Sequence, residues 1–363
     1  MHVPDGFINA PVSAAAGLVA AGAVAAGLRG ARRELDERTA PLAGLVAAFI
    51  FAVQMLNFPV AAGTSGHLLG GALAAILVGP WTGLLCLAVV LLMQGVLFAD
   101  GGLTALGVNI TLMGGVAVLV AYVLFRGLVK VLPRGRRSVT VASFVAALVS
   151  VPASAAAFTL IYAVGGTTGV PVGKVLGAMV GVHTLIGIGE AVITTATVGA
   201  VIAVRPDLVY GARGLSAPLK LRVDGELVDA APAPARVPAA RPARRIWAAG
   251  LAAAVVLAGF VSFYASASPD GLERVASDYG IDEKAEEHAA AESPLADYGV
   301  SGITDARLSG GLAGTIGVGA TLALGTGLFW AARRRAASTP DGASTPDGAG
   351  GGPSDTSRVT EHA

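Results

Sequence analysis

Long apolar runs, separated by short charged or Pro/Gly-containing stretches, make up most of this sequence. The runs predict helices near residues 10–28, 40–57, 66–79, 81–98, 104–125, 139–164, 175–204, 246–267 and 309–332. A helix that crosses a bilayer needs roughly 20 apolar residues. The pattern therefore predicts an all-α, polytopic membrane bundle of about seven transmembrane helices, with two more in a C-terminal module.

Positive charges alternate between the loops and indicate the orientation. The loops after the first, fifth and seventh runs are basic and contain Arg29, Arg32, Arg33, Arg38, Arg126, Lys130, Arg134, Arg136, Arg137, Arg205 and Arg213. Lys174 is the only Lys or Arg in the loops at 58–65, 99–103 and 165–174. Because cytoplasmic loops retain Lys and Arg, the N-terminus is expected outside. A single helix over 66–98 would place the basic loop at 126–137 outside, so two helices that meet near Pro80 and Trp81 fit better.

Composition narrows the class of protein. Apolar residues make up 54% of the 363 positions and charged residues 13%, about half the share usual in soluble domains. The mean hydropathy is +0.70. These values exclude a water-soluble enzyme, and the net charge of +1 gives no argument for nucleic acid. The single cysteine, Cys86, excludes an internal disulfide and a Cys-based metal site.

Changes in composition divide the chain into four parts. We expect a membrane module at 1–210, a cytoplasmic Pro-rich linker at 211–245, a two-span module at 246–336 and a disordered tail at 337–363, where Ser-Thr-Pro-Asp-Gly-Ala occurs twice. The second module contains an acidic extracytoplasmic segment, 268–308, with ten acidic and three basic residues. No basic stretch precedes the first apolar run, so we expect no cleaved signal and a retained Met1.

Two of the five histidines are expected at the same outer face. His2 is the second residue, and His67 begins the third apolar run after an outside loop. The Met1 amine, the His2 backbone nitrogen and His2 Nδ1 can close adjacent chelate rings around one metal, and His67 could add a fourth nitrogen. Four nitrogens near a plane suit Ni²⁺, Cu²⁺ or Co²⁺ better than Mg²⁺, Ca²⁺ or Zn²⁺. The alternative, which spacing alone favours, is a solvated terminal His2 and a polar helix-end His67.

Four ordered motifs carry a family resemblance. They are residues 1–7 (MHVPDGF), 63–71 (GTSGHLLGG), 98–109 (FADGGLTALGVN) and 183–190 (HTLIGIGE). They closely resemble the CbiM/NikM family, the metal-binding substrate component of energy-coupling-factor (ECF) cobalt/nickel transporters. The resemblance covers about residues 1–210. Residues 268–273 (SPDGLE) resemble the signature of the small two-span companion subunit, of the PDGLE, CbiN or NikN type.

The resemblance implies both a site and a function. The metal ligands of the family map onto Met1, His2 and His67. The chain would then be the substrate-capture subunit of an ATP-driven importer in a prokaryotic plasma membrane, taking up Co²⁺ or Ni²⁺ as cargo without a resident cofactor. Partners would be a membrane-embedded coupling (T) subunit and two separate ATP-binding subunits. The alternative is an autonomous divalent cation channel or carrier.

Four further polar residues at membrane depth are candidates for supporting the ligands. Asp100, Asn109, His183 and Glu190 lie within apolar surroundings, where polar groups usually have partners. His183 and Glu190 are two helical turns apart, so we expect them to pair or to position a loop. A direct metal role for His183 stays open. For Asp100 and Asn109, turn capping and interhelical hydrogen bonding are the alternatives.

Two surfaces are candidates for contacts with partners. Residues 13–28 are mostly Ala, Gly and Val, which permits close packing within the subunit or, as the resemblance implies, against the coupling subunit. The acidic segment 268–308 is a contact surface on the first module, a solvated loop or, through His288, a weak metal ligand. The sequence has no G-x-x-x-x-G-K-[ST] or His-Glu-x-x-His motif, so ATP hydrolysis and zinc proteolysis are not expected of this chain.

Overall fold

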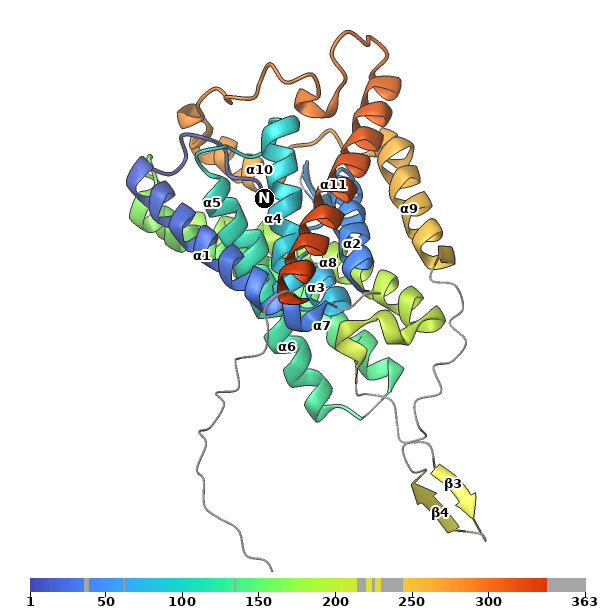
Figure 1. Ribbon diagram of the computed structural model, residues 1–363. Coiled ribbons are helices and arrows are strands. Elements are labelled where there is room, and N and C mark those ends of the chain that lie inside the picture. The colour runs from blue at the N-terminus through green and yellow to red at the C-terminus, as the bar shows by residue number, and fades with distance from the viewer. Residues whose placement is uncertain are drawn as a thin grey trace, which may run out of the picture.

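Helices account for most of this computed structural model, which describes residues 1–35, 39–61, 63–133, 135–213, 220–223, 226–229 and 244–337. In the first module they are α1 (Ala10–Glu34), α2 (Thr39–Gln54), α3 (Gly71–Val78), α4 (Pro80–Leu97), α5 (Leu106–Asn109), the π-helix η1 (Ile110–Val116), α6 (Ala117–Val131), α7 (Arg136–Gly165) and α8 (Val172–Val204). The second module contains α9 (Arg244–Gly259), α10 (Gly271–Tyr279) and α11 (Ala306–Ala337). The predicted all-α class is confirmed (Figure 1).

Short elements connect these helices. The 3₁₀ turns are η2 (Pro206–Leu208), η3 (Tyr210–Ala212), η4 (Val261–Tyr264), η5 (Asp282–Lys284) and η6 (Ala296–Tyr298). β1 (Phe58–Ala61) pairs antiparallel with β2 (Thr64–Gly66), and β3 (Lys220–Val223) pairs with β4 (Glu226–Asp229). Most of the expected linker, the expected tail from 338 onward, Arg38 and Arg134 lie outside the described residues.

Seven helices within the described ranges are long and apolar enough to cross a bilayer. They are Ala10–Glu34, Pro80–Leu97, Leu106–Val131, Arg136–Gly165, Val172–Val204, Arg244–Tyr264 and Ala306–Arg333. Large apolar side chains such as Leu18, Leu119 and Val164 are more than half exposed on their outer faces. Water would penalise this exposure and lipid does not, so the chain is a multi-pass membrane protein.

The third apolar run departs from its predicted form. The sequence predicts a helix over 66–79, but α3 has eight residues and is only about 12 Å long. Residues 67–70 enter the bundle without helical structure, and Gly70 has a left-handed φ of 85°. A break at Gly79, with φ 100°, separates α3 from α4, which confirms two helices in this region.

The fifth predicted span is one continuous path with an irregular start. The π-helix η1 follows α5 immediately, and α6 continues to Val131. The hydroxyl of Ser154 on α7 donates to the Leu112 carbonyl inside η1 at 2.9 Å. A π-helix changes the direction of side chains relative to an α-helix, here directly after Asn109.

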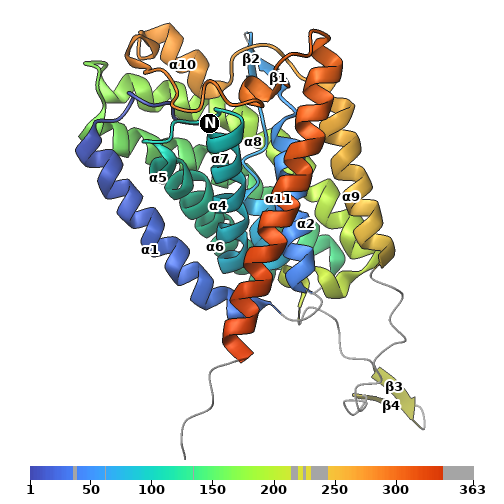
Figure 2. The same ribbon diagram turned by 45° about the horizontal axis from the view of Figure 1, so that its top comes forward.

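The two long helices of the second module pack against α2 of the first. α9 and α11 flank α2 on one side of the bundle (Figure 2). Small residues permit the close approach: a Cβ at Gly44 would lie 2.3 Å from the Thr326 side chain, and one at Gly317 would lie 2.2 Å from Phe51. Buried residues of both modules therefore belong to one hydrophobic core.

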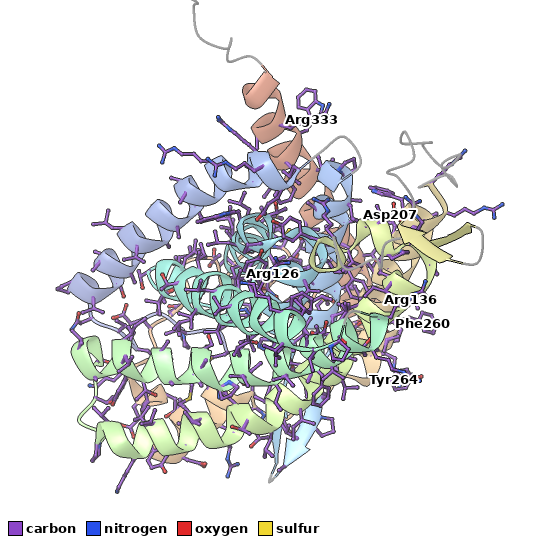
Figure 3. The ribbon with its side chains drawn as sticks, turned by 90° about the horizontal axis from the view of Figure 1, so that it is seen from below. Arg126, Arg136, Asp207, Phe260, Tyr264 and Arg333 are labelled. Carbon is purple, nitrogen blue, oxygen red and sulfur yellow. The ribbon has the colours of Figure 1, made fainter. Side chains whose placement is uncertain are left out.

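The outer and inner ends of the bundle differ in charge. The N-terminus lies near α4, α5 and α10 at the upper end, beneath the segment that connects η4 to α11 (Figures 1 and 2). Arg126, Arg136 and Arg333 lie toward the opposite end, which Figure 3 views from below. This separation is what an outside N-terminus requires.

Candidate metal centre

The first five residues run into the protein as an extended segment that Asn109 holds. Met1 and Val3 are buried. The Asn109 side chain accepts the Val3 N–H at 2.8 Å and donates to the Val3 carbonyl at 3.1 Å. The Gly102 N–H donates to the same carbonyl at 2.9 Å. Asn109, predicted as a supporting residue, therefore binds the backbone of the residue directly after His2.

Asp5 fastens this segment to the loop before α5. Its carboxylate accepts the N–H groups of Leu103 and Thr104 and the Thr104 hydroxyl. A Cβ at position 102 would lie 2.3 Å from the Asp5 nitrogen, so only glycine fits where these two segments meet. Gly102 of the Asp-Gly-Gly sequence at 100–102 therefore lets the loop approach the backbone of the N-terminal segment closely.

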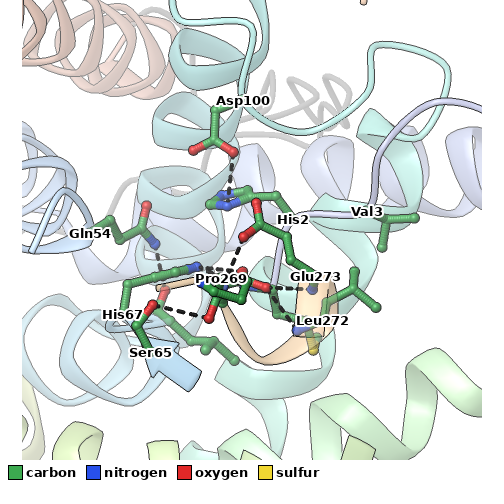
Figure 4. Close-up of polar contacts among 12 residues, drawn as sticks. His2, Val3, Gln54, Ser65, His67, Asp100, Pro269, Leu272 and Glu273 are labelled. Atoms are coloured by element: carbon green, nitrogen blue, oxygen red, sulfur yellow. Dashed lines mark hydrogen bonds and ion pairs between the residues drawn. The ribbon is translucent and has the colours of Figure 1, made fainter. Parts of the chain in front are cut away.

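His67 reaches the terminal amine from the end of β2. Its Nδ1 lies 3.0 Å from the Leu68 carbonyl, which can only accept, so Nδ1 carries the proton. Nε2 is then the unprotonated nitrogen and lies 2.7 Å from the Met1 amine (Figure 4). A metal-binding imidazole needs this arrangement, with one nitrogen fixed by a carbonyl and the other open.

Glu190 secures the irregular chain behind His67. Its carboxylate, buried on α8, accepts the N–H groups of Leu69 and Gly70 just before α3. Gln54 on α2 donates to the Leu69 carbonyl at 2.9 Å. Non-helical backbone inside a membrane protein needs such partners because no water reaches it. Glu190 contacts the loop that carries His67, the second of the roles expected from the sequence.

His183 and Glu190 do not pair, so the first of those expected roles is wrong. His183 Nδ1 bonds to the Met179 carbonyl at 2.8 Å within α8. Its Nε2 is buried and has no hydrogen-bond partner among the described residues. Two helical turns place both side chains on one face of α8, but the Glu190 carboxylate instead accepts the N–H groups of Leu69 and Gly70, just before α3.

Both ring nitrogens of His2 lie near polar side chains, and the Gln94 amide oxygen accepts a hydrogen bond from Nε2–H. Nε2 lies 3.2 Å from Gln94 Oε1, and Nδ1 lies 3.3 Å from Asp100 Oδ1. The ring stacks on His67 with centroids 5.0 Å apart. Burial lowers the pKa of His2 to about 4, against the opposing effect of Asp100. The imidazole is therefore neutral at physiological pH, as coordination requires.

Tyr298 connects the two partners of His2. Its hydroxyl donates to Asp100 Oδ2 at 2.6 Å and accepts from the Gln94 amide at 3.0 Å. Burial and the Asp100 carboxylate raise the pKa of Tyr298 well above its usual value, so the phenol keeps its proton. Asp100 thus supports His2 within a network that the second module completes.

The second module also brings a carboxylate to the terminal amine. Asp270 Oδ2 lies 2.9 Å from the Met1 nitrogen and 3.6 Å from His67 Nε2. Burial raises the pKa of Asp270, but the charge of the nearby Met1 amine outweighs it and holds the pKa well below its usual range. The carboxylate is ionised beside the candidate ligands.

The acidic segment lies against the first module. The Glu286 N–H donates to the Asp5 carbonyl at 3.1 Å, and His288 Nε2 lies 3.2 Å from the Gly101 carbonyl. Between the modules is a cavity of about 640 Å³, lined in part by His2, His67, Asp100, Asp270, Glu286 and His288. These contacts favour the contact-surface interpretation over a solvated loop.

Side chains alone do not form a metal site in the part of the chain that the structure describes. No group of three or more His, Cys, Asp or Glu side chains there could hold an ion. The convergent nitrogens at Met1 and His67 instead combine a terminal amine with an imidazole.

Comparison with known families is decisive for the first module. Residues 2–208 match the model of the cobalt uptake substrate-specific transmembrane region, CbiM, and residues 244–334 match the PDGLE domain. The chain belongs to the CbiM family. The relatives of this CbiM-family chain are metal transport proteins, which is consistent with a transporter rather than an enzyme.

Individual relatives agree with this assignment. A candidate metal transport protein of Haloquadratum walsbyi is 39% identical over 210 residues, which are 58% of this chain and 94% of that protein. A candidate fused nickel transport protein, NikMN, of Archaeoglobus fulgidus is 38% identical over 58% of this chain and 68% of its own length. The cobalt transport protein CbiM of Sorangium cellulosum is 35% identical over 52% and 84%.

A solved structure also resembles this CbiM-family chain. The crystal structure of a truncated transition metal transporter has a TM-score of 0.50 and 27% identity, and it covers 56% of this chain and 99% of that one. The shared fold corresponds in extent to the CbiM region.

Four residues of the candidate centre were not predicted from the sequence. Each contacts the N-terminal segment or its partners: Asp5, Gln94, Asp270 and Tyr298. Asp270 begins a D-x-x-E capping box, and this motif predicts the start of a helix at the outer face. Tyr298 gives no local signal, because its role depends on how the two modules pack.

Proposed function

We propose that this chain captures Co²⁺ or Ni²⁺ on the extracytoplasmic side through the Met1 amine, the His2 backbone nitrogen and imidazole, and His67. The observation that carries the proposal is the buried 2.7 Å approach of the Met1 amine to His67 Nε2. Adjacent ligands in a planar set with metal–nitrogen bonds of about 2.0–2.1 Å lie about 2.9 Å apart. The two nitrogens already have nearly the spacing that one ion needs.

His2 supplies the rest of the chelate in this proposal. Gln94 Oε1 accepts a hydrogen bond from Nε2–H, which leaves Nδ1 unprotonated. Nδ1 is the nitrogen that can close a ring with the His2 backbone. To do so it exchanges its contact with Asp100 for the metal, and Asp100 and Tyr298 remain at the rim of the site.

The donor chemistry favours late divalent transition metals. Nitrogen ligands suit Ni²⁺ and Co²⁺, whereas Mg²⁺ and Ca²⁺ prefer oxygen. The names of the relatives include both nickel and cobalt transport. We therefore propose the metal class and leave the choice between the two open.

For the whole chain we propose a fused importer subunit of a prokaryotic plasma membrane. We propose a division into a capture module at 1–210, a linker at 211–245, a companion at 246–336 and a tail at 337–363, which the family matches at 2–208 and 244–334 support. The energy for uptake comes from two separate ATP-binding subunits through a membrane-embedded coupling subunit. The small-residue face of α1 is the proposed contact with that coupling subunit.

The terminal chelate is tested by metal content and spectroscopy of the purified chain with its native N-terminus. One extra residue before Met1 and, separately, His67→Ala are each expected to abolish stoichiometric Ni²⁺ or Co²⁺ binding. His362→Ala, which removes a histidine near the C-terminal end of the sequence, is the matched control and retains binding. Full binding by the extended chain would place the site elsewhere.

Uptake measurements distinguish an importer subunit from an autonomous channel or carrier. Radioactive Ni²⁺ or Co²⁺ uptake is compared in cells that express this chain with and without coupling and ATP-binding subunits. The proposal expects accumulation only with the partners. Equal accumulation by this chain alone would establish the channel or carrier instead.

A further inference from the structure

Asp270 uses its two carboxylate oxygens for different purposes. Oδ1 accepts the N–H groups of Leu272 and Glu273 at 2.8 and 2.9 Å and caps α10. The Glu273 carboxylate accepts the Asp270 N–H in return, which completes a capping box. Oδ2 takes no part in the cap and faces the Met1 amine and His67 Nε2.

The position of Asp270 is fixed by its neighbours as well as by the cap. Ser65 next to the His67 segment donates its N–H to the Pro269 carbonyl and its hydroxyl to the Ser268 carbonyl. A Cβ at Gly271 would lie 2.8 Å from the Ile186 side chain and 3.0 Å from the His183 ring. The Pro-Asp-Gly turn is therefore seated between β2 and α8, and only glycine allows that approach.

Three atoms converge in a triangle that one ion can span. The sides are 2.7 Å between the amine and His67 Nε2, 2.9 Å between the amine and Asp270 Oδ2, and 3.6 Å between His67 Nε2 and Asp270 Oδ2. The circle through the three atoms has a radius of about 1.8 Å, which is below a metal–ligand bond of about 2.0–2.2 Å. An ion slightly out of their plane can therefore contact all three.

We propose that Asp270 Oδ2 is a direct oxygen ligand of the captured cation, supplied by the fused second module. This inference rests on the proposed terminal chelate and adds a ligand to it. The bound ion would have a nitrogen set from the first module and one carboxylate oxygen from the second. The site would be complete only when both modules are in contact.

Charge supports a ligand role for this carboxylate. Asp270 and Met1 are both nearly inaccessible to water, at 7% and 2% exposure. A divalent ion on a neutral amine, two neutral imidazoles and a backbone nitrogen that has released its proton to solvent would leave one uncompensated positive charge in this environment, which is costly. Asp270 reduces that charge at the ion itself, whereas Asp100 is bonded to Tyr298 at the rim.

The test compares Ni²⁺ affinity and X-ray absorption for the native chain, Asp270→Asn and Glu273→Gln. Asn keeps the size and the capping oxygen of Asp but not its charge. Gln at 273 removes a nearby charge but still accepts the Asp270 N–H. We expect one oxygen donor in the native first shell, its loss or lengthening in Asp270→Asn with affinity reduced about 10–100-fold, and little change in Glu273→Gln.

Each other outcome contradicts the inference in a recognisable way. A native chain whose bound Ni²⁺ shows four nitrogens in a plane, with affinity unchanged by Asp270→Asn, would overturn the ligand role and leave the terminal chelate intact. Equal losses in Asp270→Asn and Glu273→Gln would show an effect of charge at a distance. A native chain that binds no metal would overturn both the ligand role and the proposed function.

Discussion

The two segments that carry the candidate nitrogens reach the centre by different routes. Residues 67–70 pass through the interior of the bundle, where Glu190 and Gln54 bind their backbone. Residues 1–5 lie across its outer end, held by Asn109 from below and by the second module from above. Side chains of the first module bind the backbone of residues 67–70, whereas both modules bind the backbone of the terminal segment.

This difference distinguishes the two proposed imidazole ligands, because the His67 ring is fixed within the first module and the His2 ring is not. His67 has one ring nitrogen committed to its own neighbour's carbonyl and the other directed to the amine. His2 contacts Gln94 and Asp100, and both of these contact Tyr298 of the second module. Substitutions behind His67 should therefore affect folding most, and substitutions around His2 should affect metal binding more selectively.

The largest effect is expected from Glu190→Ala. It leaves the buried N–H groups of Leu69 and Gly70 without their acceptor, at a cost of about 1–3 kcal/mol each. Thermal unfolding in detergent should show a loss of about 2–5 kcal/mol, and metal binding through His67 should fail with it. Glu190→Gln, which keeps one acceptor oxygen, should recover part of the stability. Native stability in the alanine variant would contradict this account of the third span.

A more selective effect is expected from Asn109→Ala. The substitution removes both hydrogen bonds to Val3, so the terminal segment loses its position while the bundle remains. Metal affinity should drop about 10–100-fold in calorimetry. Asn9→Ala is the matched control, because it removes the cap of α1 and costs about 1 kcal/mol of stability without contact to the centre. Equal losses of affinity in both variants would show that Asn109 acts only through overall stability.

Much of the fold follows from the hydrophobic pattern, and the third span shows where that reasoning ends. The apolar run at 66–79 has the composition of a helix, yet Gly66, Gly70 and Gly71 permit an extended entry that a carboxylate from α8 then stabilises. That partner lies about 120 residues away in sequence. Local periodicity predicts where helices and strands occur. It does not predict which distant side chain supplies hydrogen-bond partners to the backbone where a helix is interrupted.

The candidate centre was predictable to a similar extent. The chemistry of Met1, His2 and His67 can be stated from residue types, because a terminal amine beside a histidine is a local feature. The contributions of Asp270 and Tyr298 depend on packing between the two modules, through contacts that span 269 and 198 residues of sequence. The same limit explains why Glu190 was expected beside His183 rather than beside the His67 segment.

The pH dependence of metal binding tests whether burial keeps the His2 ring neutral. The sequence alone predicts weaker binding below about pH 6, where a free imidazole gains a proton. Burial lowers the pKa of His2 to about 4, so in the folded chain this ring stays neutral through pH 5. In the unfolded chain His2 takes up a proton near pH 6.5, whereas in the folded chain it does so only near pH 4. The unfolded state is therefore favoured between these values, and the stability contributed by neutral His2 is lost as the pH falls from about 6.5 toward 4.

Calorimetric metal titrations between pH 7 and 4.5 check this expectation. The slope of log affinity against pH should stay constant to about pH 5 and steepen only below it. Thermal unfolding of the metal-free chain should show stability declining already below pH 6.5. A slope that steepens at pH 6 would mean that one of the two proposed imidazole ligands, His2 or His67, gains a proton there, and burial would then not keep both rings neutral.

The smallest effect is expected from Tyr298→Phe. The phenylalanine keeps the stacking of this ring on Phe98, whose centroids lie 4.8 Å apart, and removes only the hydroxyl between Asp100 and Gln94. One net hydrogen bond is worth about 0.5–1.5 kcal/mol, so metal affinity should fall about two- to tenfold with unfolding nearly unchanged. Gln94, whose amide oxygen accepts from His2 Nε2, then loses its Tyr298 partner and is free to rotate, and faster metal dissociation in stopped-flow measurements should accompany the loss. Unchanged affinity and dissociation would show that the second module acts on the terminal segment through Asp270 and not through the His2 ring.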